Sequence, residues 1–420
     1  MRQITAAGIT GSVLEWYDFY TFGVAASLIF PTYFFPGSSP GVGLLKSFAT
    51  FALGFFARPV GGVVLAHYGD RIGRKGILMF TIIVMGVATA LMGVLPGYAQ
   101  IGIWAPVLLI VLRLVQGFAA GAELGGASLL CAEQAPVGRR GFFASLPTIG
   151  VTVGLLLASG MFAIVSQLPT DQFESWGWRV PFLLSVVLIV IGVWIRSSVK
   201  ESNTFLEAKE KTAPVKVPAI EVFRRERRSL FVVLGATMAE NGVFYILSVF
   251  LLSYMTSGFH FSRNVALLIV SIAAILATIT IPLFGALTDR IGRKPVYLGG
   301  AILSLLLAFP IFLLGATGSP VLMGVGLAIG IAGGWGAMTA VKGAYYAELF
   351  ATRTRFSGWS LGREIGSVLA GGIAPFIASA LVLATGGAWW PVAIYIVVLT
   401  VISIIAVASG PETYRKGLPE

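Results

Sequence analysis

Gly69-Asp-Arg-Ile-Gly-Arg-Lys75 returns almost unchanged as Thr288-Asp-Arg-Ile-Gly-Arg-Lys294, 219 residues further along the chain. A second repeat has nearly the same period, because Ala132-Glu133 returns as Ala347-Glu348, each time just ahead of two arginines. Each copy follows long apolar runs at a corresponding place in its half of the chain. Repeats at a long fixed spacing indicate a duplicated unit, so the sequence predicts two related halves in the same orientation.

The residues around these repeats are strongly apolar. Hydrophobic residues make up 57% of the 420-residue chain, charged residues only 11%, and the mean hydropathy is +0.90. Soluble domains carry about a quarter charged residues, so this composition excludes a disordered chain and argues against a water-soluble enzyme. The apolar runs are about 20 residues long, which is the length of a membrane-spanning helix and too long for the strands of a membrane barrel.

We therefore predict an all-α membrane protein with twelve transmembrane helices in two six-helix halves. The expected spans are residues 8–35, 42–66, 76–95, 104–134, 139–167, 179–198, 229–257, 263–287, 296–315, 320–347, 355–384 and 388–408. The charged segment between the sixth and seventh spans is expected to join the halves. This division gives an N-terminal half at 1–198, a cytoplasmic linker at 199–228 and a C-terminal half at 229–420.

The basic residues are distributed unevenly between the two sides of the predicted bundle. Of the 29 Lys and Arg, 22 fall in segments on the side of the two termini and three on the other side. Cytoplasmic segments of membrane proteins are enriched in Lys and Arg, so we expect both termini in the cytoplasm. The same bias accounts for the net charge of +11, which therefore does not indicate a nucleic-acid partner. A single cysteine, Cys131, and two histidines exclude an intrachain disulfide and give no metal-site spacing.

Eight motifs are spread from about residue 8 to residue 412. They are Gly11-x-x-x-Glu15-Trp-Tyr-Asp18-Phe, Ala57-Arg58-Pro59-x-Gly61-Gly62, Gly69–Lys75, Arg113-x-x-Gln116-Gly117, Glu123-x-Gly125-Gly126-Ala127, Ser175-Trp-Gly-Trp-Arg179-Val-Pro181-Phe182, Glu201-x-x-x-Phe205 and Glu348-Leu-Phe. As a set they resemble the metabolite:proton symporter family of the major facilitator superfamily. The resemblance implies proton-coupled uptake by alternating access across the bacterial cytoplasmic membrane, by a functional monomer that needs no cofactor beyond the proton gradient. The family includes carriers of citrate, 2-oxoglutarate, shikimate, and proline or betaine, so the resemblance leaves the substrate open.

Ionisable residues inside predicted membrane helices are costly and therefore point to function. Our candidates for proton coupling are Asp18, Arg113, Glu123 and Glu15. In related proton/sugar symporters the first and fourth helices carry an acid opposite an arginine, and Asp18 and Arg113 resemble that pair. A carboxylate beside a guanidinium stays ionised, and it can take up a proton when the arginine moves away. The alternatives are a permanent structural ion pair and Glu123 as the proton site.

Two cations, Lys342 in the tenth span and Arg363 in the eleventh, are expected at similar depths, about 9 and 12 Å from the cytoplasmic end. Arginine binds a carboxylate through two parallel hydrogen bonds, and lysine attracts it as a point charge. We expect this pair to receive an anionic substrate, whereas family members tend to have neutral residues at these positions. The alternative is internal neutralisation. In that case Arg363 pairs with Glu364 or Glu348, and Lys342 pairs separately with Glu240.

Polar and aromatic side chains in the first, fourth, seventh, tenth and eleventh spans are expected to complete a substrate cavity. They are Tyr17, Tyr20, Gln116, Asn241, Tyr245, Trp335 and Glu364. For each aromatic residue the alternative role is packing, because aromatic rings fill most helix interfaces.

The repeated loop motif predicts a gate on the cytoplasmic side. Its residues are Asp70, Arg71, Arg74 and Arg140 in the first half and Asp289, Arg290 and Arg293 in the second. An acid at a helix end can pair with Arg140 or with a helix N-terminus across the bundle, which would latch that side while the site faces outward. The alternative, charges that only set the topology, accounts for the basic residues but not for the repeated Asp-Arg-x-Gly-Arg order.

The expected function is proton-coupled import of a small organic acid, such as a di- or tricarboxylate or a shikimate-like acid. Its partners are then the anionic substrate, protons and the lipid bilayer. Among carriers, the alternative is a proton symporter of a zwitterion such as proline or betaine. A membrane-embedded enzyme is the alternative from another class. ATP-driven transport is not expected, because the chain has no Walker lysine motif.

Overall fold

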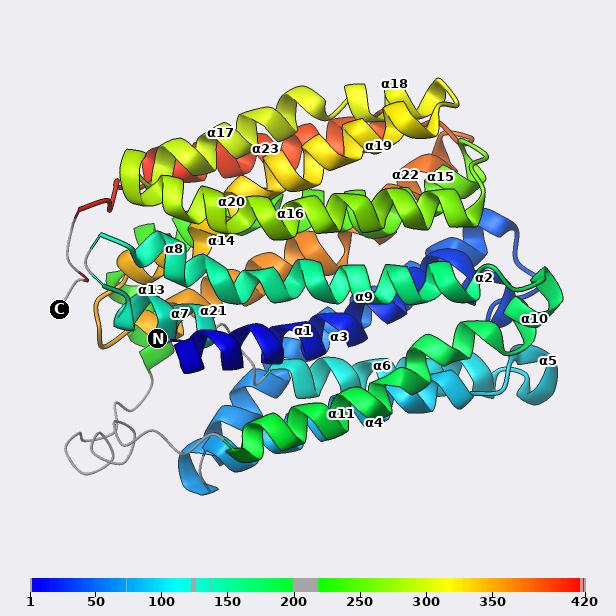
Figure 1. Ribbon diagram of the computed structural model, residues 1–420, viewed down its shortest axis with the longest axis horizontal. Coiled ribbons are helices and arrows are strands. Elements are labelled where there is room, and N and C mark those ends of the chain that lie inside the picture. Colours follow the sequence, from blue (N-terminus) through cyan, green and yellow to red (C-terminus); the bar gives the residue numbers. More distant parts are fainter. Residues whose placement is uncertain are drawn as a thin grey trace.

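The computed structural model describes residues 2–72, 74–121, 126–136, 138–198, 218–415 and 418. Side chains are described at these residues outside positions 2–4, 7, 66, 67, 69–75, 78, 126, 195–198 and 218–221. Within the described residues every regular element is helical, and most helices follow the long axis of the molecule (Figure 1). The predicted all-helical fold is confirmed.

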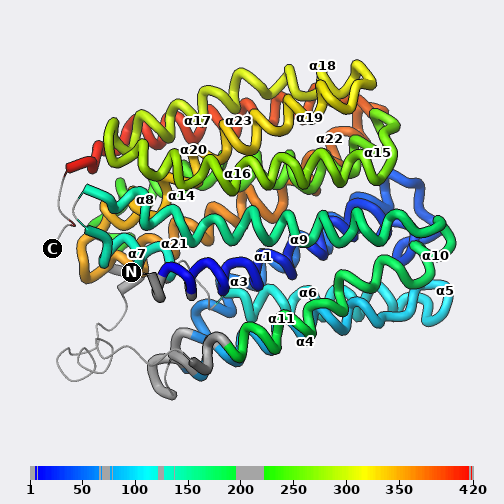
Figure 2. The backbone as a smooth tube through the Cα atoms, viewed as in Figure 1, coloured from blue at the N-terminus to red at the C-terminus, as the bar shows by residue number. Residues whose placement is uncertain are grey.

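Helices α1 to α11 lie together, and they occupy the lower part of the molecule in Figures 1 and 2. The long helices of this first group are α1 (Arg2–Leu28), α3 (Pro40–Ile72), α4 (Arg74–Val94), α6 (Trp104–Ala120), α9 (Ile149–Val165) and α11 (Val180–Ser198). Shorter helices join them: α2 (Phe30–Tyr33), α5 (Tyr98–Ile101), α7 (Gly126–Gln134), α8 (Arg140–Ser145), η2 (Leu146–Thr148), α10 (Thr170–Ser175) and η3 (Gly177–Arg179).

The remaining helices form a second group, most of which lies in the upper part of the same view, whereas α13 and α21 overlap the first group there. They are α13 (Pro218–Arg225), α14 (Arg227–Tyr245), α15 (Leu251–Ser257), α16 (Arg263–Ile291), α17 (Arg293–Leu307), α18 (Pro310–Ala316), α19 (Pro320–Ala328), α20 (Gly336–Glu348), α21 (Arg355–Gly366), α22 (Ala374–Ala384) and α23 (Trp390–Ser409). Three π-helical segments, η4 (Ile246–Phe250), η5 (Ile329–Trp335) and η6 (Ser367–Gly372), join α14 to α15, α19 to α20 and α21 to α22. π-helical turns are frequent at functional sites, and η6 directly follows the helix that carries Arg363 and Glu364.

The long helices are suited to a lipid environment. Nine helical runs in the described residues are long and apolar enough to cross a membrane, and two shorter apolar helices, Met79–Val94 and Trp104–Ala120, lie among them. Large apolar side chains cover the outward faces; Val63 is 73% exposed, Phe231 71% and Val321 73%. Helices satisfy their own backbone hydrogen bonds, so such faces are stable against lipid and would be unfavourable in water.

Side-chain caps fix where α16 and α17 begin. Ser262 caps α16 by accepting a hydrogen bond from the backbone N–H of Val265, at 3.3 Å. Helix α17 is capped from a distance, because Glu412, which follows α23, accepts hydrogen bonds from the backbone N–H groups of Arg293 and Lys294 at 3.1 and 3.0 Å. A carboxylate satisfies the free N–H groups of a helix start and suits the positive end of its dipole. This cap ties the segment after α23 to the repeated motif.

The two groups of helices meet along α9 and α16. Two hydroxyl pairs cross this contact, Thr152 with Thr278 at 2.8 Å and Ser159 with Ser271 at 2.9 Å. The start of α1 and the segment after α23 lie at the same end of the bundle (Figure 1). We call this end the terminal end and the other the opposite end.

Candidate transport site and terminal gate

A row of alternating charges crosses from the first group of helices to the second. Arg58 of α3 donates a hydrogen bond from Nη2 to Glu15 of α1 at 2.9 Å. Its Nε lies 3.4 Å from Oε2 of Glu364 on α21, which is an ion pair whose geometry falls short of a hydrogen bond. Arg363 donates from Nη1 to Oε1 of Glu364 at 2.8 Å. All four side chains are at least nine-tenths buried, so each charge depends on its neighbours in the row.

A second ion pair lies between α14 and α20. Lys342 Nζ donates to Glu240 Oε1 at 2.8 Å, and the Thr339 hydroxyl donates to the same oxygen at 2.8 Å. The other oxygen of Glu240 is buried and has no hydrogen-bond partner among the described residues. These contacts match the internal neutralisation considered above for Lys342 and Arg363. They do not exclude substrate binding, because an internal carboxylate can hold a cation until a substrate replaces it.

A small polar cavity of about 50 Å³ lies between the two groups of helices. Its wall includes Glu15, Lys342, Trp359 and Arg363, together with hydroxyls and apolar side chains from α1, α7, η2 and α9. The structure therefore brings the two predicted substrate-binding cations to one cavity, with one of the predicted proton-coupling acids facing them. At about 50 Å³ the cavity is smaller than the roughly 300–1,000 Å³ typical of ligand pockets, so a substrate would need it to widen.

Several buried polar atoms beside these charges have no hydrogen-bond partner among the described residues. They are Nε of Arg363, Nε1 of Trp359, Oγ of Ser360, Nε1 of Trp335, and the hydroxyls of Tyr20 and Tyr245. Buried donors normally have an acceptor, because a buried donor without one has lost its hydrogen bonds to water and gained none in the protein. These free donors lie around two cations. A ligand with a carboxylate and further oxygen atoms could bind the cations and accept hydrogen bonds from the donors.

The structure does not pair Asp18 with Arg113. Asp18 accepts a hydrogen bond from the Ser185 hydroxyl at 2.6 Å. Arg113 donates to the Phe51 carbonyl at 3.2 and 3.3 Å and to the Gln116 side-chain oxygen. Its guanidinium also lies 4.3 to 4.8 Å from the centres of three phenylalanine rings, which enclose it. The expected acid–arginine contact is absent among the described residues, because the aromatic cage and a carbonyl hold the arginine instead.

Three of the predicted cavity residues already have hydrogen-bond partners in the structure. Tyr17 donates to the Pro181 carbonyl at 2.6 Å, and Gln116 donates to the Thr89 hydroxyl at 2.8 Å, so both are engaged in helix packing. Asn241 donates to the hydroxyl of Ser367 in η6 at 2.5 Å.

Tyr20, Tyr245 and Trp335 belong to one aromatic cluster beside the charges. Phe244 stacks on Trp335 with ring centres 4.0 Å apart, and Tyr20 lies 5.8 Å from Phe244 and 6.3 Å from Tyr245.

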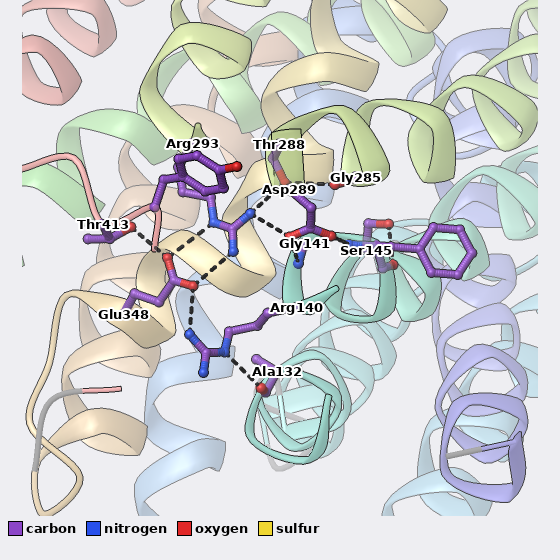
Figure 3. Close-up of polar contacts among 12 residues, drawn as sticks. Ala132, Arg140, Gly141, Ser145, Gly285, Thr288, Asp289, Arg293, Glu348 and Thr413 are labelled. Carbon is purple, nitrogen blue, oxygen red and sulfur yellow. Dashed lines mark hydrogen bonds and ion pairs between the residues drawn. The ribbon is translucent and has the colours of Figure 1, made fainter. Parts of the chain in front are cut away.

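Ion pairs join the two groups of helices at the terminal end (Figure 3). Both carboxylate oxygens of Asp289 accept backbone N–H hydrogen bonds at the start of α8, from Gly141 and Phe142, each at 2.8 Å. Arg293 connects Asp289 at 2.8 Å to Glu348 at 3.0 and 3.2 Å. For Asp289, the expected contact with a helix N-terminus across the bundle is present. Its role as a gate stays a prediction.

Glu348 and its repeat Glu133 each accept a hydrogen bond from an arginine of the other half. Arg140 donates to the Ala132 carbonyl of its own half and to Glu348 of the other half, at 3.2 and 3.1 Å. Arg355 does the same in reverse, donating to the Ala347 carbonyl and to Glu133 at 3.0 and 3.1 Å. The repeat seen in the sequence is therefore a repeat of contacts, but its copies differ in burial: the side chain of Glu348 is 1% exposed and that of Glu133 38%.

Some predicted residues take no described part in these contacts. Glu123 lies outside the described residues, and the side chains of Asp70, Arg71 and Arg74 are also outside them. Arg290 is exposed and forms no ion pair within the part of the chain that the structure describes.

Sequence reasoning gave no role in the site to Arg58 or Trp359, and it named Glu240 only as the internal partner of Lys342. Arg58 and Glu240 are intramembrane charges, so the rule that selected Arg113 and Lys342 would have selected them too. Trp359 gave no comparable signal, because it is one of nine tryptophans in a chain rich in aromatic residues. All three are buried, and Arg58 provides the link across the two groups.

Membrane-crossing helices in two groups, a cavity lined by buried charges between them and an ion-pair cluster at one end together define a polytopic membrane carrier. Residues 4–216 match the family described as Sugar (and other) transporter, and residues 233–419 match the Major Facilitator Superfamily. The shikimate transporter of Escherichia coli (strain K12) is 40% identical over 418 residues, which cover 99% of this chain and 95% of that protein. The glycine betaine/proline/ectoine/pipecolic acid transporter of Dickeya dadantii (strain 3937) is 35% identical over 427 residues, covering 99% and 84%.

The fold is also that of a solved transporter. The xylose transporter of E. coli, in a partially occluded inward-open conformation, superimposes with a TM-score of 0.74 at 16% identity, covering 99% of both chains. The chain belongs to the major facilitator superfamily, among its metabolite:proton symporters. It is a multi-pass protein of the bacterial inner membrane.

The membrane-embedded enzyme considered from the sequence is not supported, because the family matches and relatives are transporters. Gly358-Trp-Ser-Leu-Gly362 has the spacing of a hydrolase nucleophile elbow. That elbow is a sharp turn between a strand and a helix, whereas this stretch lies within α21.

Proposed function

We propose that this chain imports a small organic acid together with protons, by alternating access. The observation that carries the proposal is the pair Lys342 and Arg363, two buried cations that border one cavity. Arg363 keeps a spare Nε donor, and the spare donors of Trp359 and Ser360 come from the same helix. A carboxylate bearing hydroxyl groups would satisfy both the charge and these donors. The 40% identity to a shikimate transporter supports the same class of substrate.

We further propose the topology that such a carrier needs. Twelve spans, with the terminal end and both termini in the cytoplasm, would form an N-terminal half at 1–198, a linker at 199–228 and a C-terminal half at 229–420. The chain would act as a monomer, because each half supplies one side of the cavity. Binding of a proton by a buried carboxylate, with Asp18, Glu15 and Glu123 as the sequence-based candidates, would couple the cycle to the proton gradient.

Uptake into membrane vesicles tests this function. The panel should contain citrate, 2-oxoglutarate, shikimate, aromatic acids, proline and betaine, with an imposed pH gradient and with an uncoupler. We expect uptake of a carboxylate that stops when the gradient is dissipated. Uptake that is insensitive to the uncoupler would contradict proton coupling.

Charge-removing variants test the substrate cations. Arg363→Ala and Lys342→Ala should each raise the apparent KM by about tenfold or more, because a buried charge-assisted hydrogen bond contributes about 1.5–3 kcal/mol. Arg224→Ala removes an exposed cation that has no predicted role in the site or the gate, and it is the matched control. Unchanged apparent affinity in both site variants would contradict the anion-binding role.

A zwitterion such as proline or betaine is the second candidate. Its support is the balance of charge, since four buried acids (Glu15, Asp18, Glu240, Glu364) and four buried bases (Arg58, Arg113, Lys342, Arg363) lie near the site. A betaine transporter at 35% identity also supports it. Selective uptake of betaine or proline from the same panel, without competition by carboxylates, would favour this candidate over an organic acid.

A further inference from the structure

We propose that Glu364 is the proton carrier of this transporter, and that its carboxylate holds the place on Arg363 that the substrate carboxylate takes. The inference rests on the proposed function and deepens it. It differs from the expectation drawn from the sequence, in which Asp18 or Glu123 binds the proton.

The position of Glu364 between cations of both halves is the first observation. Its Oε1 accepts from Arg363 of its own helix at 2.8 Å, and its Oε2 lies 3.4 Å from Arg58 Nε on α3. Arg363 and Glu364 are adjacent in sequence, and neighbours on a helix do not normally face each other. The pair therefore shows that Arg363 turns toward Glu364, while Glu364 also faces Arg58 of the other group.

Incomplete satisfaction is the second observation. Arg363 Nε and Glu364 Oε2 are buried and have no hydrogen-bond partner among the described residues. The cavity of about 50 Å³ beside Arg363 also reaches Trp359, whose Nε1 is free of hydrogen bonds among those residues. The Glu364 carboxylate therefore balances the charge of Arg363 but leaves its Nε–H without an acceptor. A substrate carboxylate could balance the charge and accept from that donor as well.

Charge balance then sets the coupling. The row Glu15–Arg58–Glu364–Arg363 is neutral. A substrate monoanion that binds Arg363 leaves Glu364 without that cation, and separation of the halves removes Arg58, which keeps Glu15. A buried carboxylate without a partner is strongly unfavourable, so Glu364 takes up a proton and the row is neutral again. When the halves come together again with the site facing the other side of the membrane, Arg58 returns to Glu364. Glu364 then releases its proton and pairs again with Arg363, which releases the substrate.

The surroundings of Glu364 contain few other groups that could take over this role. Arg58 and, beyond it, Glu15 lie on the side of the first group of helices. On the other side is Arg363, and Tyr245 and the Lys342–Glu240 pair lie near that guanidinium. Glu15 and Glu240 each keep a cation of their own group when the halves part. Glu364 loses its cross-half partner and shares Arg363 with the substrate, so it is the acid whose environment changes most.

The test compares net accumulation with exchange in proteoliposomes. Transport of a monoanion with one proton is electroneutral, so a gradient of one pH unit should give about tenfold accumulation that does not respond to membrane potential. Glu364→Gln is neutral at every pH. We expect it to lose accumulation, with the internal-to-external ratio falling to about one, and to retain exchange of labelled for unlabelled substrate.

Asp18→Asn is measured in parallel as the rival. Glu364→Gln that accumulates substrate like the wild type would overturn the proposal, as would a folded Glu364→Gln protein that loses exchange together with accumulation. If the variant does not fold, the wild-type protein decides: calorimetry in two buffers with different ionisation enthalpies should show uptake of about one proton on substrate binding, and no proton uptake would overturn the proposal. A wild-type protein with no proton-driven uptake of any acid instead contradicts the proposed function itself.

Discussion

The terminal end of the bundle and the side of the site that faces away from it are held together by different contacts. At the terminal end, carboxylates and guanidiniums from the two groups of helices interlock, with Glu348 accepting from Arg140 and Arg293 at 3.0 to 3.2 Å. On the opposite side of the site, Tyr245 of α14 packs against Phe51 and Phe55 of α3, with ring centres 5.7 and 5.3 Å apart. The Ser27 hydroxyl also donates a hydrogen bond to the Val249 carbonyl across this side, at 2.9 Å.

This difference determines how each end can open. An ion-pair cluster depends on a few atoms at fixed distances, so one substitution can remove most of its strength. An aromatic contact depends on buried area, so it weakens in proportion to the surface that is lost. The terminal end should therefore respond to charge, and the opposite side to volume.

Glu348→Gln should have the largest effect, on the terminal end. The side chain is 1% exposed, and removing its charge leaves two arginines without their shared carboxylate. Breaking a buried ion pair costs about 3–5 kcal/mol, so the terminal end should open much more often. A cysteine at the buried position Ala344, in a Cys131→Ser background, reports opening through its rate of maleimide labelling.

Glu133→Gln is the matched control for that experiment. Glu133 makes the repeat contact with Arg355, but its side chain is 38% exposed. Partly exposed pairs contribute about 0–1 kcal/mol, so the labelling rate should change only slightly. Equal increases in labelling rate for the two substitutions would contradict the view that the burial of Glu348 makes its ion pairs stronger than the matching ion pair of Glu133.

Tyr245→Ala should have the next largest effect, on the opposite side. It removes a buried ring that touches Phe51, Phe55 and Tyr20, and such truncations cost about 3–5 kcal/mol, of which the share lost on opening applies here. A cysteine at Ser27 should then be labelled faster, while the cysteine at Ala344 should not.

Tyr245→Phe separates ring packing from hydroxyl chemistry. The Tyr245 hydroxyl has no hydrogen-bond partner among the described residues, so its removal should leave the labelling rate at Ser27 unchanged. A labelling rate as high as that of Tyr245→Ala would show that the hydroxyl, and not the ring, closes this side.

The same comparison explains which parts of the molecule could be predicted. The terminal contacts follow from short motifs whose repetition is visible in the chain, so Asp289, Arg293 and Arg140 could be selected by position alone. The fold followed from the length and composition of the apolar runs. The aromatic closure could not be predicted, because Phe51 and Phe55 are not distinguishable from the other aromatics among 29 Phe, and Tyr245 was selected for a substrate cavity and not for closure.

The charged site was predicted in part, for a geometric reason. Counting residues along a helix gives the depth of a side chain, which brought Lys342 and Arg363 to one level. It does not give the direction in which a side chain points or which helix it meets. The row through Arg58 and the aromatic cage that separates Arg113 from Asp18 both depend on that direction, so they required the structure.

Asp289→Asn should have a smaller effect than Glu348→Gln at the terminal end. Asparagine keeps one oxygen that can accept from the start of α8, but it loses the charge that binds Arg293 and suits the helix dipole. We expect a loss of about 1–2 kcal/mol, seen as a moderate rise in labelling at Ala344. Asp70→Asn tests the first copy of the motif, and the sequence predicts a shift in the same direction. A first-copy variant that leaves crosslinking and labelling unchanged would limit the latch to the second copy.

Thr413→Val should have the smallest effect of the series. The Thr413 hydroxyl donates to Glu348 at 2.5 Å, so the segment after α23 adds a neutral donor to a carboxylate that two arginines already hold. A single hydrogen bond contributes about 1 kcal/mol, which corresponds to a rise of about fivefold in labelling at Ala344. Thr413→Ser keeps the donor and should behave like the wild type. If Thr413→Ser raises the labelling rate as much as Thr413→Val, the segment after α23 stabilises the terminal end through packing of the threonine methyl group and not through its hydrogen bond to Glu348.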